Sequence, residues 1–170
     1  WRRSFGDASR PLVQRYLRRG ILERIKADGS VFTALDESQA REELRVLARC
    51  NVQGVAICLI NAYVNPAHEQ RLRELVLEEL GPVPCSISSE VSPLAKEYAR
   101  ASTTLIDVFM KFIYQAYTQK LDEGLRGLGF KGQLNFADCA ATLVPSDIAM
   151  ESPFQVVFAV AAYMLWRSWG

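Results

Sequence analysis

Two apolar segments with a helix-forming segment between them constrain the fold more than any other part of the chain. Residues 52–60 read VQGVAICLI and are apolar without alternation, which is typical of a parallel strand buried on both faces. Asn65 followed by Pro66 predicts a helix start, and Gly81 predicts its end. Residues 83–88, VPCSIS, read as a second strand. The order strand, helix, strand predicts a right-handed parallel βαβ unit.

The segments before this unit predict a small hairpin and a helix. Residues 21–25 and 31–34 read as two short strands around an Asp-Gly turn. Asp36 is a favourable N-cap, and Gln39 lies three residues later, as in a capping box. We therefore expect a helix that starts at Asp36 and ends near Asn51.

The longest helix is expected after the βαβ unit, over residues 94–128, with Ser92-Pro93 as its opening. At 1.5 Å per residue it would span roughly 50 Å, so we expect one bend or break. Its broad apolar face contains Tyr98, Ala101, Leu105, Val108, Phe109, Phe112, Ile113, Ala116, Tyr117 and Leu121. Residues 132–144 and 153–163 supply the last strand candidates. The expected fold class is α/β, a mostly parallel sheet with flanking helices and one long helix.

Charge and composition argue against several classes of partner. Twenty Lys and Arg balance nineteen Asp and Glu, so no general attraction to nucleic acid or to an anionic membrane is expected. The longest apolar run, residues 154–166, is shorter than the roughly 20 residues that a membrane span needs. Residues 1–20 are expected to form an irregular, solvated basic lead-in. The four cysteines form no Cys-x-x-Cys pair, which favours reduced thiols and a cytoplasmic location.

The only histidine, His68, could be a catalytic base, a metal ligand or a residue at the start of a helix. With Asn65 as the cap, His68 and Glu69 fall in the first helical turn, and capping alone explains the pair. A Ser-His-Asp triad would need this histidine, but the chain has no Gly-x-Ser-x-Gly elbow. A metal site would need further ligands, since no His-Glu-x-x-His motif occurs. No metal site is expected, and the catalytic residues stay unknown.

Polar residues near the second strand and the long helix form a further group of candidates. Ser88 and its neighbouring serine could offer hydroxyl and N–H groups to a ligand, or simply form a turn. Glu97 and Arg100 are three residues apart and could pair with each other. Thr103 and Thr104 belong to three successive hydroxyl residues, which are poor helix formers. Either interpretation places an interior polar patch beside the strand ends.

Three long stretches of the sequence resemble the hydantoinase A / 5-oxoprolinase family. They are ILERIKADGSVFTALDESQAREELRVL, VAICLINAYVNPAHEQRLREL and SISSEVSPLAKEYARASTTLIDVFMKFIYQAY. The resemblance runs in register over residues 21–158 and includes N-methylhydantoinase and acetone/acetophenone carboxylase subunits as relatives. It implies part of an actin-like ATPase unit of the sugar-kinase and heat-shock type. The parent enzyme is expected to use ATP and Mg²⁺ to activate a cyclic amide or ketone carbonyl.

The resemblance also defines what this chain is expected to lack. The family's Asp-x-Gly-Gly-Thr-type phosphate loops are expected outside residues 1–170, so the chain resembles an internal fragment. Where the family carries Ser/Ala-Gly-Pro-Ala-x-Gly, residues 159–163 read AVAAY, and residues 159–170 form an atypical end. The isolated chain is therefore expected to bind no ATP. The best candidates to face a ligand are His68, Glu69, Ser88, Glu97, Arg100, Thr103 and Thr104.

The resemblance implies two kinds of partner: a hydantoinase B-type subunit and the remaining domains of the parent subunit. A rival hypothesis assigns the chain a non-catalytic role as an interaction module. In that case Phe109, Phe112, Ile113 and Tyr117 on the long helix would dock a partner subunit, provided that they are exposed.

Overall fold

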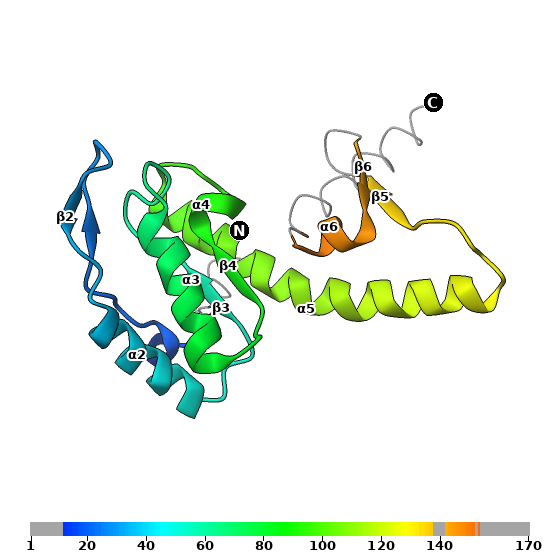
Figure 1. The fold of residues 1–170 in the computed structure, drawn as a ribbon, viewed down its shortest axis with the longest axis horizontal. Helices are drawn as coiled ribbons and strands as arrows, with labels where there is room; N and C mark the ends of the chain where they lie inside the picture. Colours follow the sequence, from blue (N-terminus) through cyan, green and yellow to red (C-terminus); the bar gives the residue numbers. More distant parts are fainter. Residues whose placement is uncertain (1–11, 138–141, 152, 154–170) are drawn as a thin grey trace, which may run out of the picture.

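The computed structural model describes residues 12–137, 142–151 and 153, and Figure 1 shows their arrangement. A lobe contains the elements up to α4 together with the first half of the long helix α5. The second half of α5 projects from this lobe and carries β5, β6 and α6 beside it (Figure 1). The elements are η1 (Arg15–Leu17), β1 (Arg24–Ile25), β2 (Val31–Thr33), α2 (Glu37–Arg49), β3 (Val55–Ile57), α3 (Ala67–Leu80), β4 (Cys85–Ile87), α4 (Ser88–Val91), α5 (Glu97–Gly127), β5 (Asn135–Ala137), β6 (Leu143–Pro145) and α6 (Ser146–Glu151).

The predicted βαβ unit is confirmed, because β3 and β4 pair in parallel with α3 between them. Val55 pairs with Cys85 and Ile57 with Ile87, and these side chains face α3 and α2. Successive strand residues point to opposite faces, so Ser86 faces α5 instead. The hydrophobic core consists of Ala40, Leu44, Leu47, Val55, Ile57, Leu72, Leu75, Val76 and Ile87.

The expectation of a mostly parallel sheet is wrong for the residues that the structure describes. They form three two-stranded sheets, of which β3–β4 is parallel, whereas β1–β2 and β5–β6 are antiparallel. The reason lies in the connections. A parallel pair needs a crossover such as α3, but the five residues between β1 and β2 can only make a hairpin.

The hairpin and the first helix follow the sequence signals closely. Asp36 accepts a hydrogen bond from the Gln39 backbone N at 3.0 Å, so the predicted cap of α2 is confirmed. The Gln39 side chain does not complete the capping box. It donates to the Gly20 carbonyl at 2.9 Å and accepts from the Leu22 N at 3.2 Å. Gln39 therefore ties the start of α2 to the segment before β1.

The N-terminal boundary of α3 lies beside the predicted cap residue. Asn65 Oδ1 accepts from the Ala67 N at 3.1 Å, and the helix begins at Ala67. Asn65 also donates through Nδ2 to the Gly29 carbonyl at 2.8 Å, in the β1–β2 turn. At the other end Gly81 adopts a φ of 78°, which a residue without Cβ reaches without strain.

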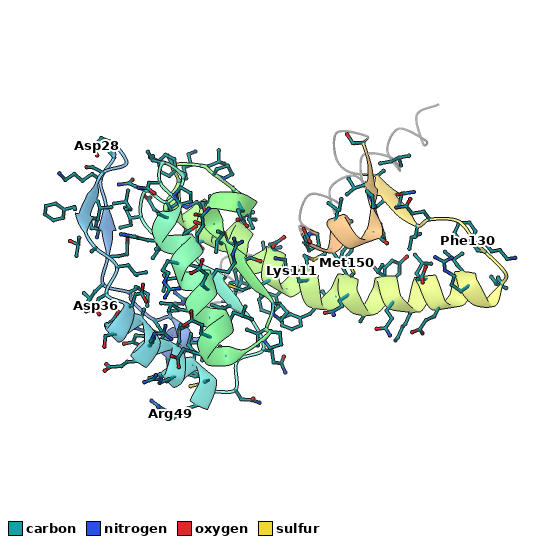
Figure 2. All side chains as sticks on the ribbon, in the orientation of Figure 1. Asp28, Asp36, Arg49, Lys111, Phe130 and Met150 are labelled. Carbon is teal, nitrogen blue, oxygen red and sulfur yellow. The ribbon has the colours of Figure 1, made fainter. Side chains whose placement is uncertain are left out.

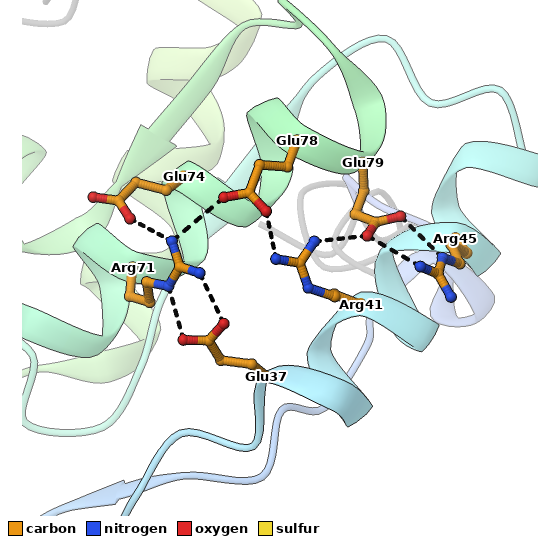
Figure 3. Close-up of polar contacts among 7 residues, drawn as sticks. All are labelled: Glu37, Arg41, Arg45, Arg71, Glu74, Glu78 and Glu79. Atoms are coloured by element: carbon orange, nitrogen blue, oxygen red, sulfur yellow. Dashed lines mark hydrogen bonds and ion pairs between the residues drawn. The ribbon is translucent and has the colours of Figure 1, made fainter.

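A network of charged side chains joins α2 to α3 on the surface (Figure 3). Arg41 lies 2.8 Å from Glu79 and also contacts Glu78, while Arg71 binds Glu37 through two nitrogens at 2.8 Å each. The Arg71 guanidinium, bonded to it, holds the pKa of Glu37 below its ordinary value. Arg45 and Arg41 lower the pKa of Glu79 in the same way. The two helices are therefore joined by charge at the surface as well as by apolar packing beneath it.

The long helix differs from its prediction in two respects. It starts at Glu97 rather than near residue 94, because residues 88–91 already form the short helix α4 and residues 92–96 are not helical. It then runs as one α-helix to Gly127 without the expected break.

The strand candidate at 132–144 is also corrected, because β5 (Asn135–Ala137) and β6 (Leu143–Pro145) are two separate strands that pair antiparallel, with Phe136 opposite Val144. The Phe136 ring lies 6.3 Å from the Tyr114 ring on α5. The strand candidate at 153–163 lies outside the described residues from residue 154 on. Among the helices that the structure describes, none is both long enough and apolar enough to cross a bilayer.

Candidate functional site

A layer of polar side chains lies between the β3–β4 pair and the first half of α5. We call this set the strand-end polar layer; it consists of Glu69, Ser86, Ser88, Arg100, Thr104, Asp107 and Lys111. All but Lys111 are buried. Lys111 lies where α5 leaves the lobe (Figure 2). Buried polar groups are tolerated only when they are bonded, so the partners of each side chain define what the layer can do.

Glu69 is the centre of this layer, and its carboxylate ties the ends of both strands together. Its Oε1 accepts from the Leu59 backbone N at 2.8 Å, just after β3, and from Ser88 Oγ at 2.5 Å, just after β4. Its Oε2 accepts from the Ser89 backbone N at 2.8 Å. Both carboxylate oxygens are thus satisfied by three donors. Glu69 belongs to the first turn of α3, but it serves the strand ends rather than capping its own helix.

Arg100 crosses from α5 to the same strand end. Its Nη2 donates to the Leu59 carbonyl at 2.5 Å, and its Nη1 donates to the Leu94 carbonyl at 2.8 Å. Its guanidinium carbon lies 5.3 Å from the centre of the Tyr63 ring, which adds a cation–π contact. Because Glu69 binds the N–H of Leu59 and Arg100 binds its carbonyl, one peptide segment is held from two sides.

The predicted pairing of Glu97 with Arg100 is wrong, since no ion pair joins these two described residues. Glu97 is exposed on the first turn of α5, whereas Arg100 points inward to backbone carbonyls.

A second group within the layer surrounds Asp107. Ser86 Oγ donates to Asp107 Oδ2 at 2.7 Å, and Lys111 Nζ lies 3.4 Å from the same oxygen. Lys111 also donates to Ser86 Oγ at 2.9 Å and to the Cys85 carbonyl at 3.2 Å. Burial raises the pKa of the Cys85 thiol to about 11, so this cysteine is an uncharged, small apolar side chain at neutral pH.

The sequence contains a second periodic pattern on α5, a row of polar residues, which the more prominent apolar periodicity of the same helix made easy to overlook. Arg100, Thr104, Asp107 and Lys111 are separated by four, three and four residues, so they lie on one stripe of α5. The apolar face predicted for this helix is largely the opposite one. Phe109, Ile113 and Tyr117 are exposed, because the strand-end serines and carbonyls offer partners that only a polar stripe can use.

His68 points away from the strand-end polar layer. Its Nδ1 lies 2.8 Å from Glu23 Oε2, at the base of the β1–β2 hairpin, and both side chains are largely buried. The helix-start interpretation of His68 agrees with its position in the first turn of α3. Among the described residues no group of three or more His, Cys, Asp or Glu side chains could hold a metal ion.

The structure therefore brings together four of the seven candidates: Glu69, Ser88, Arg100 and Thr104. Thr104 Oγ1 donates to the Arg100 carbonyl at 2.7 Å, and Thr103 is half-buried beside it. Ser88 and Ser89 do not form the expected turn, because they open α4, where the Ser88 hydroxyl and the Ser89 backbone N donate to Glu69. That any of the seven faces a ligand stays a prediction. Sequence reasoning missed Ser86, Asp107, Lys111 and the Glu23 partner of His68.

One glycine pattern also escaped the sequence analysis. Residues 127–132 read GLGFKG, which has the Gly-x-Gly-x-x-Gly spacing of dinucleotide-binding loops. That loop must follow a strand and open a helix, whereas this one follows α5 and precedes β5. A Cβ on Gly132 would lie 2.5 Å from the Phe130 ring, so the ring fills the space beside this glycine. The pattern here ends a helix and does not form a phosphate cradle.

The strand-end polar layer does not fit a nucleotide or its Mg²⁺. In the strand-end polar layer, both oxygens of Glu69 and both terminal nitrogens of Arg100 are bonded to protein groups. The Ser88 hydroxyl donates to Glu69, and the Thr104 hydroxyl donates to the Arg100 carbonyl. These side chains are fully buried, so they present no atoms to a phosphate. The layer acts as a brace for the strand ends, and no chemical step is assigned to it.

The fold and this brace define a mixed α/β unit with small sheets, one parallel strand pair and a long helix. Residues 2–80 match the model of the family described as "Hydantoinase/oxoprolinase N-terminal region". This match confirms the resemblance to the hydantoinase/oxoprolinase family that the sequence indicated.

Two relatives and two solved structures show how far the similarity extends. The chain is 33% identical to the caprolactamase subunit alpha of Pseudomonas jessenii over 149 residues, which is 85% of this chain and 21% of that subunit. It is 35% identical to the acetophenone carboxylase gamma subunit of Aromatoleum aromaticum, over 72% of this chain and 17% of that subunit.

The crystal structure of the ATP-dependent caprolactamase from Pseudomonas jessenii superposes with a TM-score of 0.75 at 33% identity, over 80% of this chain and 20% of that one. The nucleotide-free structure of acetone carboxylase gives a TM-score of 0.74 at 28% identity, over 87% and 21%. The chain spans about a fifth of the length of the relatives that it matches.

Proposed function

We propose that this chain contributes part of the scaffold of an ATP-dependent enzyme that activates the carbonyl of a cyclic amide. The observation that carries the proposal is the superposition on the ATP-dependent caprolactamase, at 33% identity over 80% of this chain. Caprolactamase and 5-oxoprolinase are both named among the relatives, and both names refer to cyclic amides. ATP would supply the phosphoryl group that makes the carbonyl reactive, as the family resemblance implies.

Within that enzyme, the role of this chain is to hold the ends of β3 and β4 in place. Glu69 and Arg100 fix the Leu59 peptide, while Asp107 and Lys111 fix Ser86 on the neighbouring strand. In open α/β proteins ligands bind beyond the carboxyl ends of parallel strands. A rigid strand end is therefore what a substrate or nucleotide held by other parts of the enzyme would require. The isolated chain is proposed to be inactive and to bind no ATP.

A specific observation supports a second candidate, part of an acetone/acetophenone-type carboxylase subunit. The identity to the acetophenone carboxylase gamma subunit is 35%, and that to the acetone carboxylase beta subunit of Xanthobacter autotrophicus is 32%. In that case the carbonyl to be activated belongs to a ketone. The scaffold role of the strand-end polar layer would be the same.

A chimera distinguishes these functions. This chain would replace the matching stretch of the Pseudomonas jessenii caprolactamase subunit alpha, and ATP hydrolysis would be measured with caprolactam, with acetophenone and without substrate. Stimulation by the lactam supports the first function, and stimulation by the ketone supports the second. A folded chimera that neither substrate stimulates would contradict both.

Calorimetric titration of the isolated chain with Mg-ATP supplies the complementary test. We expect no binding heat, because Glu69, Ser88, Arg100 and Thr104 are fully buried and expose no polar atom to a nucleotide. Micromolar affinity would overturn the proposal that other parts of the enzyme hold the nucleotide.

A further inference from the structure

Helix α5 is amphipathic with its polar side turned inward. Its inner stripe, Arg100, Thr104, Asp107 and Lys111, is bonded within the strand-end polar layer, and all of these but Lys111 are buried. Its outer stripe is apolar, and we call it the outer α5 face: Ile106, Phe109, Ile113 and Tyr117. These side chains are 41%, 47%, 60% and 55% exposed. Their separations of three, four and four residues place them in one continuous row.

The elements at the far end of the helix do not cover this row. Tyr114, which lies on another side of α5, contacts the β5–β6 hairpin through the Phe136 ring. Phe112 lies on a further side, against the lobe, where its ring would be 3.1 Å from a Cβ on Gly54. Described parts of the chain therefore pack on two sides of the row, and large apolar side chains stay exposed between them. A contiguous apolar row of this kind on a long helix marks a packing surface.

We propose that the outer α5 face packs against the polypeptide that, in full-length relatives, lies outside the stretch this chain spans. Two observations favour this occupant. The unit superposes on a solved chain of which it makes up 20%, so about four-fifths of that polypeptide is available to lie against it. The polar stripe of α5 from Arg100 to Lys111 faces the strand ends, where its side chains are bonded to them, so the side of this part of the helix that faces away from the lobe is the apolar one.

The chemistry of the face defines what the occupant must present. Phe109 and Ile113 at the centre of the row need an apolar surface with a depression that accepts a ring and a branched side chain. Lys120 and Glu123 are exposed further along α5, so the contact would have a polar edge at that end. This inference rests on the proposed function, because it takes the unit to work within a larger family polypeptide.

Thiol labelling of the chimera described above tests the proposal, because it measures the solvent accessibility of a single cysteine placed on the outer α5 face. Ile113→Cys is placed on the outer α5 face, and Leu77→Cys on α3 is the matched control, because the two native side chains are 60% and 61% exposed. A maleimide labels each variant in the isolated chain and in the chimera, and peptide mapping separates these thiols from the native cysteines. In the chimera we expect labelling at 113 to slow by about tenfold or more, with labelling at 77 unchanged.

Each outcome decides the question. Equal labelling at 113 in the two contexts, or equal protection at 113 and 77, would overturn the assignment of this face. Light scattering of the isolated chain adds a second readout that needs no chimera. A dimer that Ile113→Glu dissociates and Leu77→Glu does not would show that a second copy, rather than the family polypeptide, occupies the face. Labelling is measured without ATP or substrate, so a chimera that is inactive but protected at 113 would refute the proposed function and still support the packing surface.

Discussion

The lobe and the projecting half of α5 differ in which side chains are buried and which are exposed. In the lobe, fully buried charges such as Glu69 and Arg100 are bonded to backbone and hydroxyl groups. Along the projecting half, Ile113 and Tyr117 lie exposed. One helix thus runs from a region where its inner polar stripe is bonded to the strand ends into a region where its apolar side chains are exposed. The difference teaches that α5 is fixed by its polar stripe and leaves its apolar stripe for another surface.

The largest expected effect comes from removing the centre of the strand-end polar layer. Glu69→Ala would leave the Leu59 N, the Ser89 N and the Ser88 hydroxyl without their acceptor. We expect the free energy of unfolding to fall by about 3–5 kcal/mol in urea denaturation. Glu74→Ala, on the exposed side of the same helix, should change it by less than about 0.5 kcal/mol. Equal losses from the two variants would show that the layer does not stabilise the lobe.

The next largest effect is expected from Arg100→Lys, which keeps the charge but loses the planar fork. An ammonium cannot reach the Leu59 and Leu94 carbonyls in the geometry that two guanidinium nitrogens provide. Unfolding should become easier by about 2 kcal/mol. Arg126→Lys near the end of α5, where Arg126 pairs with Asp122 at the surface, should be neutral. A loss from Arg126→Lys as large as that from Arg100→Lys would contradict the difference between the two regions.

Substitution of one glycine in each region by alanine compares how closely α5 is packed in the lobe and in the projecting half. A Cβ at Gly54 would lie 2.7 Å from Val108 Cγ1 and 3.1 Å from the Phe112 ring, so Gly54→Ala should cost about 1–2 kcal/mol. A Cβ at Gly124 meets nothing within 4 Å, and Gly124→Ala should raise stability by about 0.5–1 kcal/mol. Thermal unfolding of both variants measures the contrast. Stabilisation by Gly54→Ala would show that α5 does not pack against the lobe as described.

The smallest effect concerns the ion pairs between α2 and α3. The pKa values of Glu37 and Glu79 are lowered from an ordinary value of 4.5, so their pairs stabilise the fold above about pH 4.5. That contribution is lost as the pH falls through the lowered values, because the unfolded chain then binds protons more readily than the folded one. The midpoint of thermal unfolding should therefore decline below pH 4.5. Glu79→Gln should make this decline shallower, and an unchanged decline would count against the network.

The sequence predicted the elements of the lobe well where local chemistry decides them. Asp36 and Asn65 mark the helix starts to within a residue or two, and the apolar run around Val55 marks the strand. The face of α5 could not be predicted in the same way. An apolar row normally faces the protein interior. Here Arg100 and Asp107 are buried instead, and only the geometry of the strand ends, which offer them hydrogen-bond partners, shows why. The role of Glu69 was hidden for the same reason, since its three donors come from two distant segments.

The attachment of the β1–β2 hairpin has a consequence for the order in which the chain assembles. The hairpin is held by residues that follow it by 36 to 45 positions: Asn61 bonds the Ile25 carbonyl, Asn65 the Gly29 carbonyl and His68 the Glu23 carboxylate. During synthesis on a ribosome, the hairpin thus emerges well before these anchors do. It can gain its place only after the first turn of α3 has left the exit tunnel, so an early part of the lobe settles later than its position in the sequence suggests.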